Sequence, residues 1–371
     1  MSRTLVIIPI VIVASCLGAT AGAHPQNPPP TQQAAPPPPT DQAEGGPGGG
    51  TPLRLGSALI TGGVWLDASK VTNDVQRETT DTFNVRRARL GIAGNLTPRI
   101  GWNLSGDLTA EPVLRNAFVA IRVAKHLTVR VGQANPVVSL ERGSSPLALE
   151  LIDRSHVTSE LTGPLDVGVT LFNAEPYRRW LSYALNLNNG AGFNRPDDND
   201  AKDVSGRIAI APPGVKHLTV VASGTRGEQP LGRRERASVG FDYNGPSFRV
   251  MAEGLRQRRD NLPVSDGFFV MTAMRVRPAV VTPNFQMVEF AVRLSVLRDP
   301  ATAAGQSAGL PSDDGSAPIL TEAGIVTTRE FHAGVNYYVT SGMRIMTNVV
   351  VPIDARLHPG PSIRSRLQIQ F

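Results

Sequence analysis

From about residue 55 to its end, the chain consists of short segments in which apolar and polar residues alternate. One example is the stretch FQMVEFAVRLSV, residues 285–296. It places Val288, Phe290, Val292, Leu294 and Val296 on one parity, against Glu289, Ala291, Arg293 and Ser295 on the other. A period of two predicts a β-strand with one apolar and one polar face.

About sixteen such segments follow one another, and no apolar run is long enough for a membrane-spanning helix. They begin near residues 55, 82, 100, 113, 127, 166, 180, 204, 218, 233, 247, 267, 285, 328, 343 and 362. An even number of strands of roughly ten residues is typical of a single-chain outer-membrane barrel. The predicted fold is therefore all-β: a transmembrane antiparallel β-barrel of about 16 strands.

The connections between these segments alternate in length, as in barrels with short periplasmic turns and long external loops. Short ones follow Leu96, Val123 and Val339. The long ones are Ala134 to Leu165, Asn188 to Lys202, Arg256 to Asp266, and Asp299 to Val326. A soluble β-sandwich has no reason to segregate its loops in this way, so the alternation supports the barrel.

The first residues predict export. Arg3 precedes an apolar run, and small residues ending at Ala23 form an A-x-A cleavage site, which indicates a Sec-type signal peptide over residues 1–23. Cys16, the only cysteine, lies inside this segment, so cleavage after Ala23 leaves a chain without thiols or disulfides. The alternative is that residues 13–16 form a lipobox and that Cys16 is lipidated.

Residues 24–53 are rich in Pro, Gln, Ala and Gly and contain almost no large apolar residue. Such a segment cannot bury a core, so we expect a disordered, partly polyproline tether. The barrel domain is then expected over residues 54–371.

The parity that carries the polar residues is rich in arginine. If the apolar parity faces lipid, these arginines face the lumen and are the predicted pore-lining and anion-binding residues. They are Arg87, Arg89, Arg122, Arg130, Arg207, Arg234, Arg236, Arg249, Arg275, Arg277, Arg293, Arg344, Arg364 and Arg366. The same rule turns fewer carboxylates inward: Asp107, Asp242, Glu253, Glu289 and Glu330.

Arginine is preferred to lysine throughout: 33 of the 37 basic residues are Arg, and the four lysines are expected in turns or loops. The planar guanidinium suits bidentate contacts with phosphate or carboxylate groups. Genomic base composition is the competing explanation of this bias. The inward parity of the arginines is therefore better support for an anion path than their number.

Four stretches resemble the phosphate-selective porin family, the O and P porins of Gram-negative outer membranes. They are FNVRRARLGIAG from Phe83, LTVRVGQANPVVSLE from Leu127, LNLNNGAG from Leu185, and the ending IRSRLQIQF. The resemblance implies a sixteen-stranded barrel, usually a homotrimer, whose third external loop narrows the pore. It also implies that Phe371 is the signal read by the outer-membrane assembly machinery.

By its position, the connection from Ala134 to Leu165 matches the constriction loop of this family. It mixes arginines with carboxylates, so its own charge does not favour anions. Residues Ser145 to Ser155 are expected to form one or two helical turns. The family's phosphate site implies lysines as well as arginines in the pore, and no lysine is expected on a strand here, which puts phosphate specificity in doubt.

Enzymatic and nucleic-acid-binding readings find little support, and we predict neither a catalytic site, a metal site nor a cofactor. The six histidines show no metal-binding spacing, and the sequence DRSH at residues 153–156 is more simply a polar loop cluster than a catalytic triad. The basic charge is spread over strands, and the aromatic residues that stack on nucleic acids are scarce.

Two functions are consistent with the sequence. The favoured one is an integral outer-membrane porin, surrounded by lipid, that lets phosphate or other small anionic solutes diffuse passively. The other is a plugged or structural barrel that anchors another envelope component through its Pro-rich tether. Inward arginines favour the first hypothesis.

Overall fold

In the computed structural model, the described residues are 53–55, 58–71, 81–135, 137–173, 180–197, 199–229, 232–260, 262–278, 285–300, 325–353 and 360–371. All of them lie in Pro36–Phe371, one of the two units into which the chain divides. The expected signal peptide, with Cys16, and all of the expected tether except Leu53 fall outside the described residues.

Strands make up most of the described structure. The first nine are β1 (Leu53–Leu55), β2 (Ala58–Val71), β3 (Asp81–Thr97), β4 (Ile100–Asp107), β5 (Leu114–Ala124), β6 (Leu127–Ala134), β7 (Asp166–Phe172), β8 (Leu181–Asn188) and β9 (Asp203–Ile210). The remaining eight are β10 (Leu218–Gln229), β11 (Gly232–Asn244), β12 (Phe248–Arg259), β13 (Ser265–Val276), β14 (Met287–Pro300), β15 (Ile325–Thr340), β16 (Met343–Pro352) and β17 (Ser362–Gln370).

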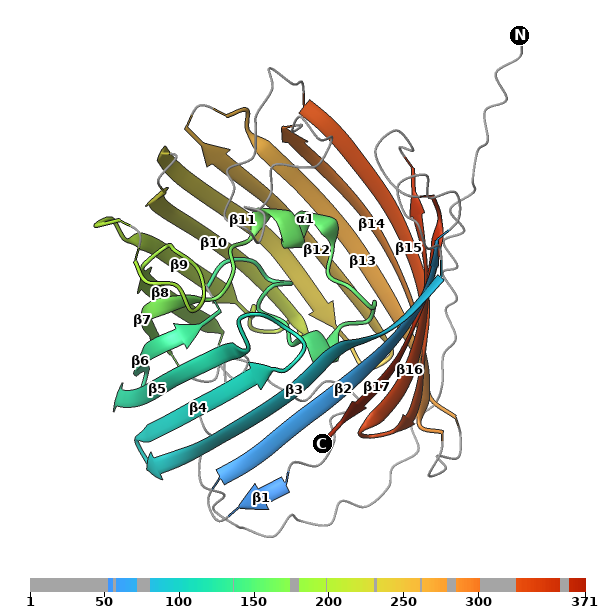
Figure 1. Cartoon of the computed structure of the whole chain (residues 1–371), viewed down its shortest axis with the longest axis horizontal. Coiled ribbons are helices and arrows are strands. Elements are labelled where there is room, and N and C mark those ends of the chain that lie inside the picture. The colour runs from blue at the N-terminus through green and yellow to red at the C-terminus, as the bar shows by residue number, and fades with distance from the viewer. Residues whose placement is uncertain are drawn as a thin grey trace. The chain divides into compact units, whose positions relative to one another are not determined.

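Strands β2 to β17 pair with their sequence neighbours in antiparallel register, and β17 also pairs with β2. In Figure 1 the red β17 returns to lie beside the blue β2. The result is a closed 16-stranded antiparallel barrel, which confirms the predicted fold. Each predicted strand start lies within three residues of an observed one. The short β1 is additional and pairs with the beginning of β2, Leu53 opposite Ile60.

Burial along the strands is the inverse of a soluble sheet. On β14, Phe290, Val292 and Leu294 are 40–45% exposed, whereas Glu289 and Arg293 are at most 2% exposed. A row of exposed large apolar side chains suits contact with lipid, and the buried charges need partners inside the ring. The alternation in the sequence therefore separates an apolar outer face from a polar inner face.

Details of the connections differ from the sequence prediction. Strand β12 continues to Arg259 and β13 begins at Ser265, so the connection predicted from Arg256 to Asp266 is shorter than expected. Lys70, expected in a loop, is the penultimate residue of β2 and pairs with Asp81 on β3 at 3.5 Å.

Two short helices follow β6 in the described part of the chain: the 3₁₀ turn η1 (Pro146–Ala148) and α1 (His156–Leu161). The prediction of helical turns between Ser145 and Ser155 is correct for η1 but misplaces the α-helix. The Ser155 side chain accepts a hydrogen bond from the Thr158 amide and caps α1, so this helix starts just beyond the predicted segment. None of the helices among the described residues has the length and apolar character to cross a membrane.

Candidate pore constriction

The chain between β6 and β7, described at residue 135 and residues 137–165, lies against the inner face of the barrel, and we call it the inner loop. Its backbone carbonyls accept hydrogen bonds from arginines of three distant strands. Arg293 donates to the carbonyl of Asp153 at 2.9 Å, Arg344 to that of Leu149 at 3.0 Å, and Arg366 to that of Ile152 at 2.8 Å. Because these donors come from β14, β16 and β17, the loop must cross the interior.

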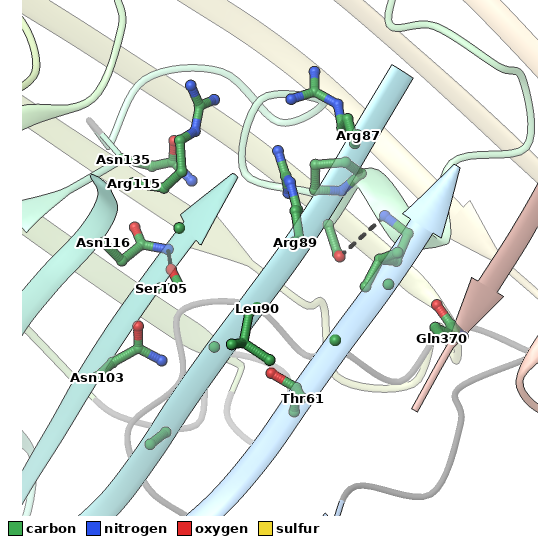
Figure 2. Close-up of a pocket in the computed structure, with 18 of the residues that line it drawn as sticks. Thr61, Arg87, Arg89, Leu90, Asn103, Ser105, Arg115, Asn116, Asn135 and Gln370 are labelled. Atoms are coloured by element: carbon green, nitrogen blue, oxygen red, sulfur yellow. Dashed lines mark hydrogen bonds between the residues drawn. The ribbon is translucent and has the colours of Figure 1, made fainter. Parts of the chain in front are cut away.

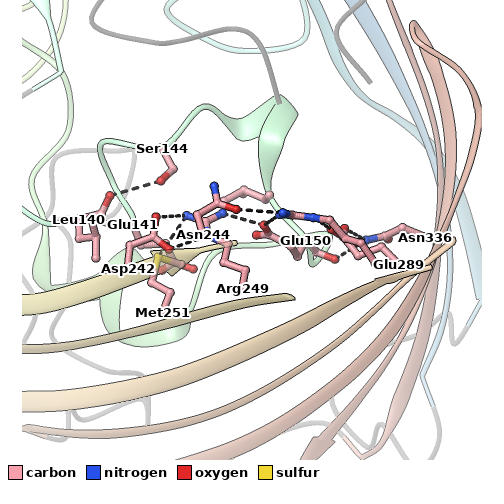
Figure 3. Close-up of polar contacts among 12 residues, drawn as sticks. Leu140, Glu141, Ser144, Glu150, Asp242, Asn244, Arg249, Met251, Glu289 and Asn336 are labelled. Carbon is pink, nitrogen blue, oxygen red and sulfur yellow. Dashed lines mark hydrogen bonds and ion pairs between the residues drawn. The ribbon is translucent and has the colours of Figure 1, made fainter. Parts of the chain in front are cut away.

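Carboxylates of the loop and of the wall hold further arginines in a buried network (Figure 3). Glu150 of the loop pairs with Arg249 at 2.7 Å and with Arg275 at 3.4 Å. Arg249 also pairs with Asp242 at 2.8 Å, and Arg275 with Glu289 at 2.8 Å. Charges removed from water need this kind of pairing, because an unpartnered buried charge is strongly destabilising.

The carboxylate of Glu253 holds the beginning of the inner loop, at residues 139–141. Glu253 of β12 accepts hydrogen bonds from the amide of Leu140 at 2.7 Å, the amide of Glu141 at 3.1 Å and the hydroxyl of Ser139 at 2.8 Å. Glu141 in turn accepts from the hydroxyl of Ser155 at 2.7 Å, just before α1. These bonds fix the loop at both sides of η1.

Apolar contacts complete the attachment. Val157 and Leu161 of α1 form a buried cluster with Leu255 of β12 and Leu297 of β14. A second buried cluster joins loop and wall residues: Leu140, Leu151, Ala209, Val221, Met251, Phe269, Met271, Ala273 and Ala291. The loop therefore packs on the side of the barrel formed by β9 to β14, where several inward residues are apolar.

On the opposite side, a cavity of about 330 Å³ lies between the inner loop and strands β2 to β5. Five arginines line it: Arg87, Arg89, Arg115, Arg142 and Arg154. Figure 2 shows Arg87, Arg89 and Arg115 at one end of this space, near Asn135. No Asp or Glu occurs among the described residues that line the cavity. It is therefore a cationic space bounded by the loop that occupies the interior.

The wall of this cavity contains a compact group of aromatic and charged residues. Arg87 and Arg89 both contact the fully buried Asp107, at 3.0 and 3.4 Å. The guanidinium carbons of Arg87, Arg89 and Arg366 lie 5.1, 5.4 and 4.6 Å from the ring centroid of Trp65, within cation–π range. Trp65 is 2% exposed, and its Nε1 has no hydrogen-bond partner in the described protein.

The alternation rule missed two of the arginines in this region, because β-bulges move them. Trp65 of β2 pairs with Arg87 of β3, but the next residue, Leu66, pairs with Val85, so Arg86 has no residue opposite it on β2. The guanidinium group of Arg86 lies 3.9 Å from the carboxylate of Asp153. A similar shift in the pairing of β4 and β5 involves Arg115. A bulge breaks the period of two, so parity alone gives no signal for these positions.

The loop supplies Arg142 and Arg154, which the strand rule does not cover. Arg154 is held by the carbonyls of Ser144 at 2.6 Å and Glu141 at 3.3 Å. The Nε of Arg142 has no hydrogen-bond partner in the described protein. Burial, together with neighbouring arginines such as Arg154 and Arg115, lowers the pKa of Arg142 to about 9. Its guanidinium is thus still cationic at neutral pH. A nearby anion would stabilise this charge, because it would offset the repulsion by the neighbouring arginines.

The predicted site residues therefore fall into groups. Arg87 and Arg89 line the cavity, whereas Arg249, Arg275, Arg293, Arg344, Arg364 and Arg366 contact the inner loop. Arg364 pairs with Asp153 at 2.8 Å. Burial opposes ionisation of Asp153, but Arg364, Arg366 and Arg86 lower its pKa below the ordinary value.

The other predicted arginines have different surroundings. Arg130 is buried between the rings of Phe118 and Phe172, Arg234 pairs with Asp203 at 3.2 Å, and Arg236 donates to Gln257 at 2.8 Å. Arg207 lies near Gly143 of the loop, and Arg122 is half-buried towards the end of β5. Arg277 follows β13 and donates to the carbonyl of Pro246 in the adjacent turn.

Phe371 extends the closing seam by one residue. Its amide and carbonyl exchange hydrogen bonds of 3.0 Å with Gly62 of β2, and its side chain is 41% exposed. Within the described ranges, no group of three or more His, Cys, Asp or Glu is arranged to hold a metal ion.

The barrel is similar to outer-membrane proteins of known structure. It superposes on OmpF of Salmonella typhi, solved in complex with daunomycin, with a TM-score of 0.60 and 12% identity, over 86% of this chain and 100% of that one. It also superposes on the outer-membrane channel DcaP of Acinetobacter baumannii, with a TM-score of 0.53 and 13% identity, over 87% of this chain and 100% of that one. For the trimer form of OmpT of Vibrio cholerae, the TM-score is 0.52 and the identity 10%, over 85% of this chain and 99% of that one.

These matches show the fold of the outer-membrane porins. The family model described as phosphate-selective porin O and P matches residues 59–231. The resemblance drawn from the sequence is confirmed by this match, and the fold and the family match together indicate a channel of the Gram-negative outer membrane rather than an enzyme. No curated protein sequence matches it.

Proposed function

We propose that this porin is a passive, anion-preferring diffusion channel whose selective passage is the cavity between the inner loop and strands β2 to β5. The observation that carries the proposal is the composition of the cavity lining. Five arginines border about 330 Å³, and no carboxylate does so among the described residues. Pores lined by arginine favour anions, because fixed positive charge stabilises an anion that has lost part of its hydration.

The charge balance of the lining supports this proposal. Asp107 lies beneath Arg87 and Arg89 and neutralises one of the two charges. Arg115 and Arg142 form no ion pair in the part of the chain that the structure describes. Low-dielectric walls focus this excess field into the passage and raise the local concentration of anions.

The remaining inward arginines have a different role in this proposal. Their guanidinium groups donate hydrogen bonds to carboxylates or carbonyls of the loop and the wall. These arginines are Arg249, Arg275, Arg293, Arg344 and Arg366. They position the loop that narrows the barrel, and the conducting path is left to Arg87, Arg89, Arg115, Arg142 and Arg154. The arginine-rich wall expected from the sequence thus divides into a holding set and a selecting set.

The test is the zero-current potential of the refolded protein in a planar bilayer under a potassium chloride gradient. We expect a potential of anion-selective sign, reduced by the double substitution Arg115→Gln and Arg142→Gln. Arg277→Gln is the matched control, because Arg277 lies in a turn outside the cavity, and it is expected to leave the potential unchanged.

Two outcomes would contradict the proposal. Cation selectivity of the unsubstituted protein would mean that another surface controls the passage. Absence of any conductance from a folded barrel would instead favour the plugged or structural barrel, with the Pro-rich tether as its binding segment.

Assembly and targeting belong to the same proposal. Trimeric forms occur among similar porins, so we expect a homotrimer in outer-membrane lipid. Sec-type export through residues 1–23, and use of Phe371 by the assembly machinery, remain expectations from the sequence.

A further inference from the structure

The cavity has two chemically different zones. Arg87, Arg89 and Arg115 lie at one end, and Thr61, Asn103, Ser105 and Asn116 lie along the wall beneath them (Figure 2). The second zone contains amides and hydroxyls and no charged group. A passage used only by an inorganic anion needs the first zone, but it has no use for an adjacent surface of neutral hydrogen-bonding groups.

Buried polar atoms without a hydrogen-bond partner in the described protein include both donors and an acceptor at this cavity. The Nε atoms of Arg87 and Arg142 and the Nε1 of Trp65 are donors without a partner in the described protein. The Oδ1 of Asn103 is a buried acceptor without one. Asn116 and Ser105, by contrast, bond to each other at 3.0 Å. Chloride offers no donor for Asn103, and inorganic phosphate has no hydroxyl beyond its own head group, whereas a hydroxylated organic anion carries donors at a distance from its charge.

We propose that the cavity is a binding site for hydroxylated organic anions, the chemical class of sugar phosphates and sugar acids. The anionic group lies among Arg87, Arg115 and Arg142, and hydroxyl groups of the body donate to Asn103 and accept from Trp65. This inference rests on the proposed anion channel and adds a second recognition element to it.

The dimensions and the apolar lining fit such a ligand. The cavity volume falls within the range of sites for small organic molecules, roughly 300–1,000 Å³. Pro146, Leu147 and Leu165 of the inner loop border the same space and can cover the C–H groups of a ring. A small site with a few placed polar groups and apolar walls is the usual form of a specific organic-ligand pocket.

The experiment is the block of chloride current through single channels by glucose 6-phosphate, gluconate, inorganic phosphate and glucose, each titrated separately. We expect both organic anions to block at concentrations about ten-fold lower than phosphate, the effect of one additional good hydrogen bond. Glucose, which lacks the charge, is expected to give no block. Comparison of glucose 6-phosphate with gluconate shows whether the head group that is preferred is a phosphate or a carboxylate.

Asn103→Ala tests the neutral zone separately from the charged one. It should raise the blocking concentration of both organic anions to about that of phosphate, and leave phosphate block and zero-current potential unchanged. Asn186→Ala is the matched control, because Asn186 is a buried asparagine of β8 that does not line the cavity. We expect no effect from it.

The inference is overturned if phosphate blocks as well as the organic anions, or if Asn103→Ala leaves the organic anions unaffected. Either result would leave the anion channel intact, because the zero-current potential measures that property independently. If Asn103→Ala alters the potential, Trp65→Phe, which removes the Nε1 donor and keeps an aromatic ring, provides the second variant. An unchanged preference for the organic anions in that variant, with normal selectivity, would also contradict the inference.

Discussion

At the scale of single residues, the pore differs from a uniform arginine lining because neighbouring guanidinium groups experience different surroundings. Arg249 lies between Asp242 and Glu150, at 2.8 and 2.7 Å, and its charge is fully compensated. Arg142 has no such partner in the described protein and is close to other arginines. The same residue type is therefore paired with carboxylates in one place and left without a carboxylate partner in another.

The low pKa of Arg142 predicts a pH-dependent selectivity. With a pKa of about 9, the guanidinium is charged at pH 7 and loses its proton as the pH rises through 9. Anion selectivity, measured as the zero-current potential, should therefore decrease between pH 7 and 10. Arg142→Gln removes the group, so this variant should show a lower selectivity at pH 7 and a smaller change over the same interval. An equal change in both proteins would assign the effect to another group.

At the scale of elements, the inner loop is held in place by the wall rather than by its own secondary structure. Its only regular segments among the described residues are η1 and α1, of three and six residues. Isolated helices this short are not stable in water. Hydrogen bonds from arginines, the acceptor Glu253 and the contacts of Val157 and Leu161 with the wall supply the stability.

Releasing one of these attachments should widen the passage. Glu253→Ala removes the acceptor of the Leu140 and Glu141 amides and of the Ser139 hydroxyl. Each buried amide left unpaired costs about 1–3 kcal/mol, enough to shift the loop to other arrangements. We expect a larger and noisier single-channel conductance and weaker anion selectivity, since Arg142 adjoins this bend. The exposed carboxylate of Glu235 provides the control: Glu235→Ala should leave the conductance unchanged.

At the scale of the whole molecule, the barrel is closed by the pairing of β17 with β2, which are nearly 300 residues apart in the chain. Arg366 and Asp67 cross this seam with two hydrogen bonds of 2.7 Å. Closure satisfies the backbone groups of both terminal strands, and an open edge in the hydrocarbon layer would leave them without partners.

The register of the seam predicts a specific cross-link. Ser365 lies directly opposite Ala68, so cysteines at these two positions should form a disulfide on oxidation, in a protein in which Cys16 is replaced by Ser. The cross-link is detected as faster migration of the denatured chain, reversed by reductant, because it closes a large loop. Ser365→Cys combined with Ala252→Cys on β12 is the control and should remain reduced. Equal cross-linking of both pairs would contradict the register.

Much of the barrel could be predicted from the sequence, because the period of two is imposed by lipid on one side and the interior on the other. Alternation in β14 and β17 placed Arg293 and Arg366 on the inner parity, and both are buried there in contact with the inner loop. The prediction failed where the period is interrupted. The bulges near Arg86 and Arg115 depend on how two strands pair, and one strand's sequence does not contain that information.

The sequence by itself determined the strand count, the order of the strands and the side of the sheet on which each regular arginine lies. These follow from local alternation and from connection lengths, which each segment carries independently of the rest. Only the tertiary structure decided which arginines hold the inner loop and which border the cavity. That division depends on where residues 135–165 lie across the barrel, and this position is set by contacts with residues that are distant in the chain. The cavity is likewise a property of the assembled interior, because its polar lining comes from five strands and a loop.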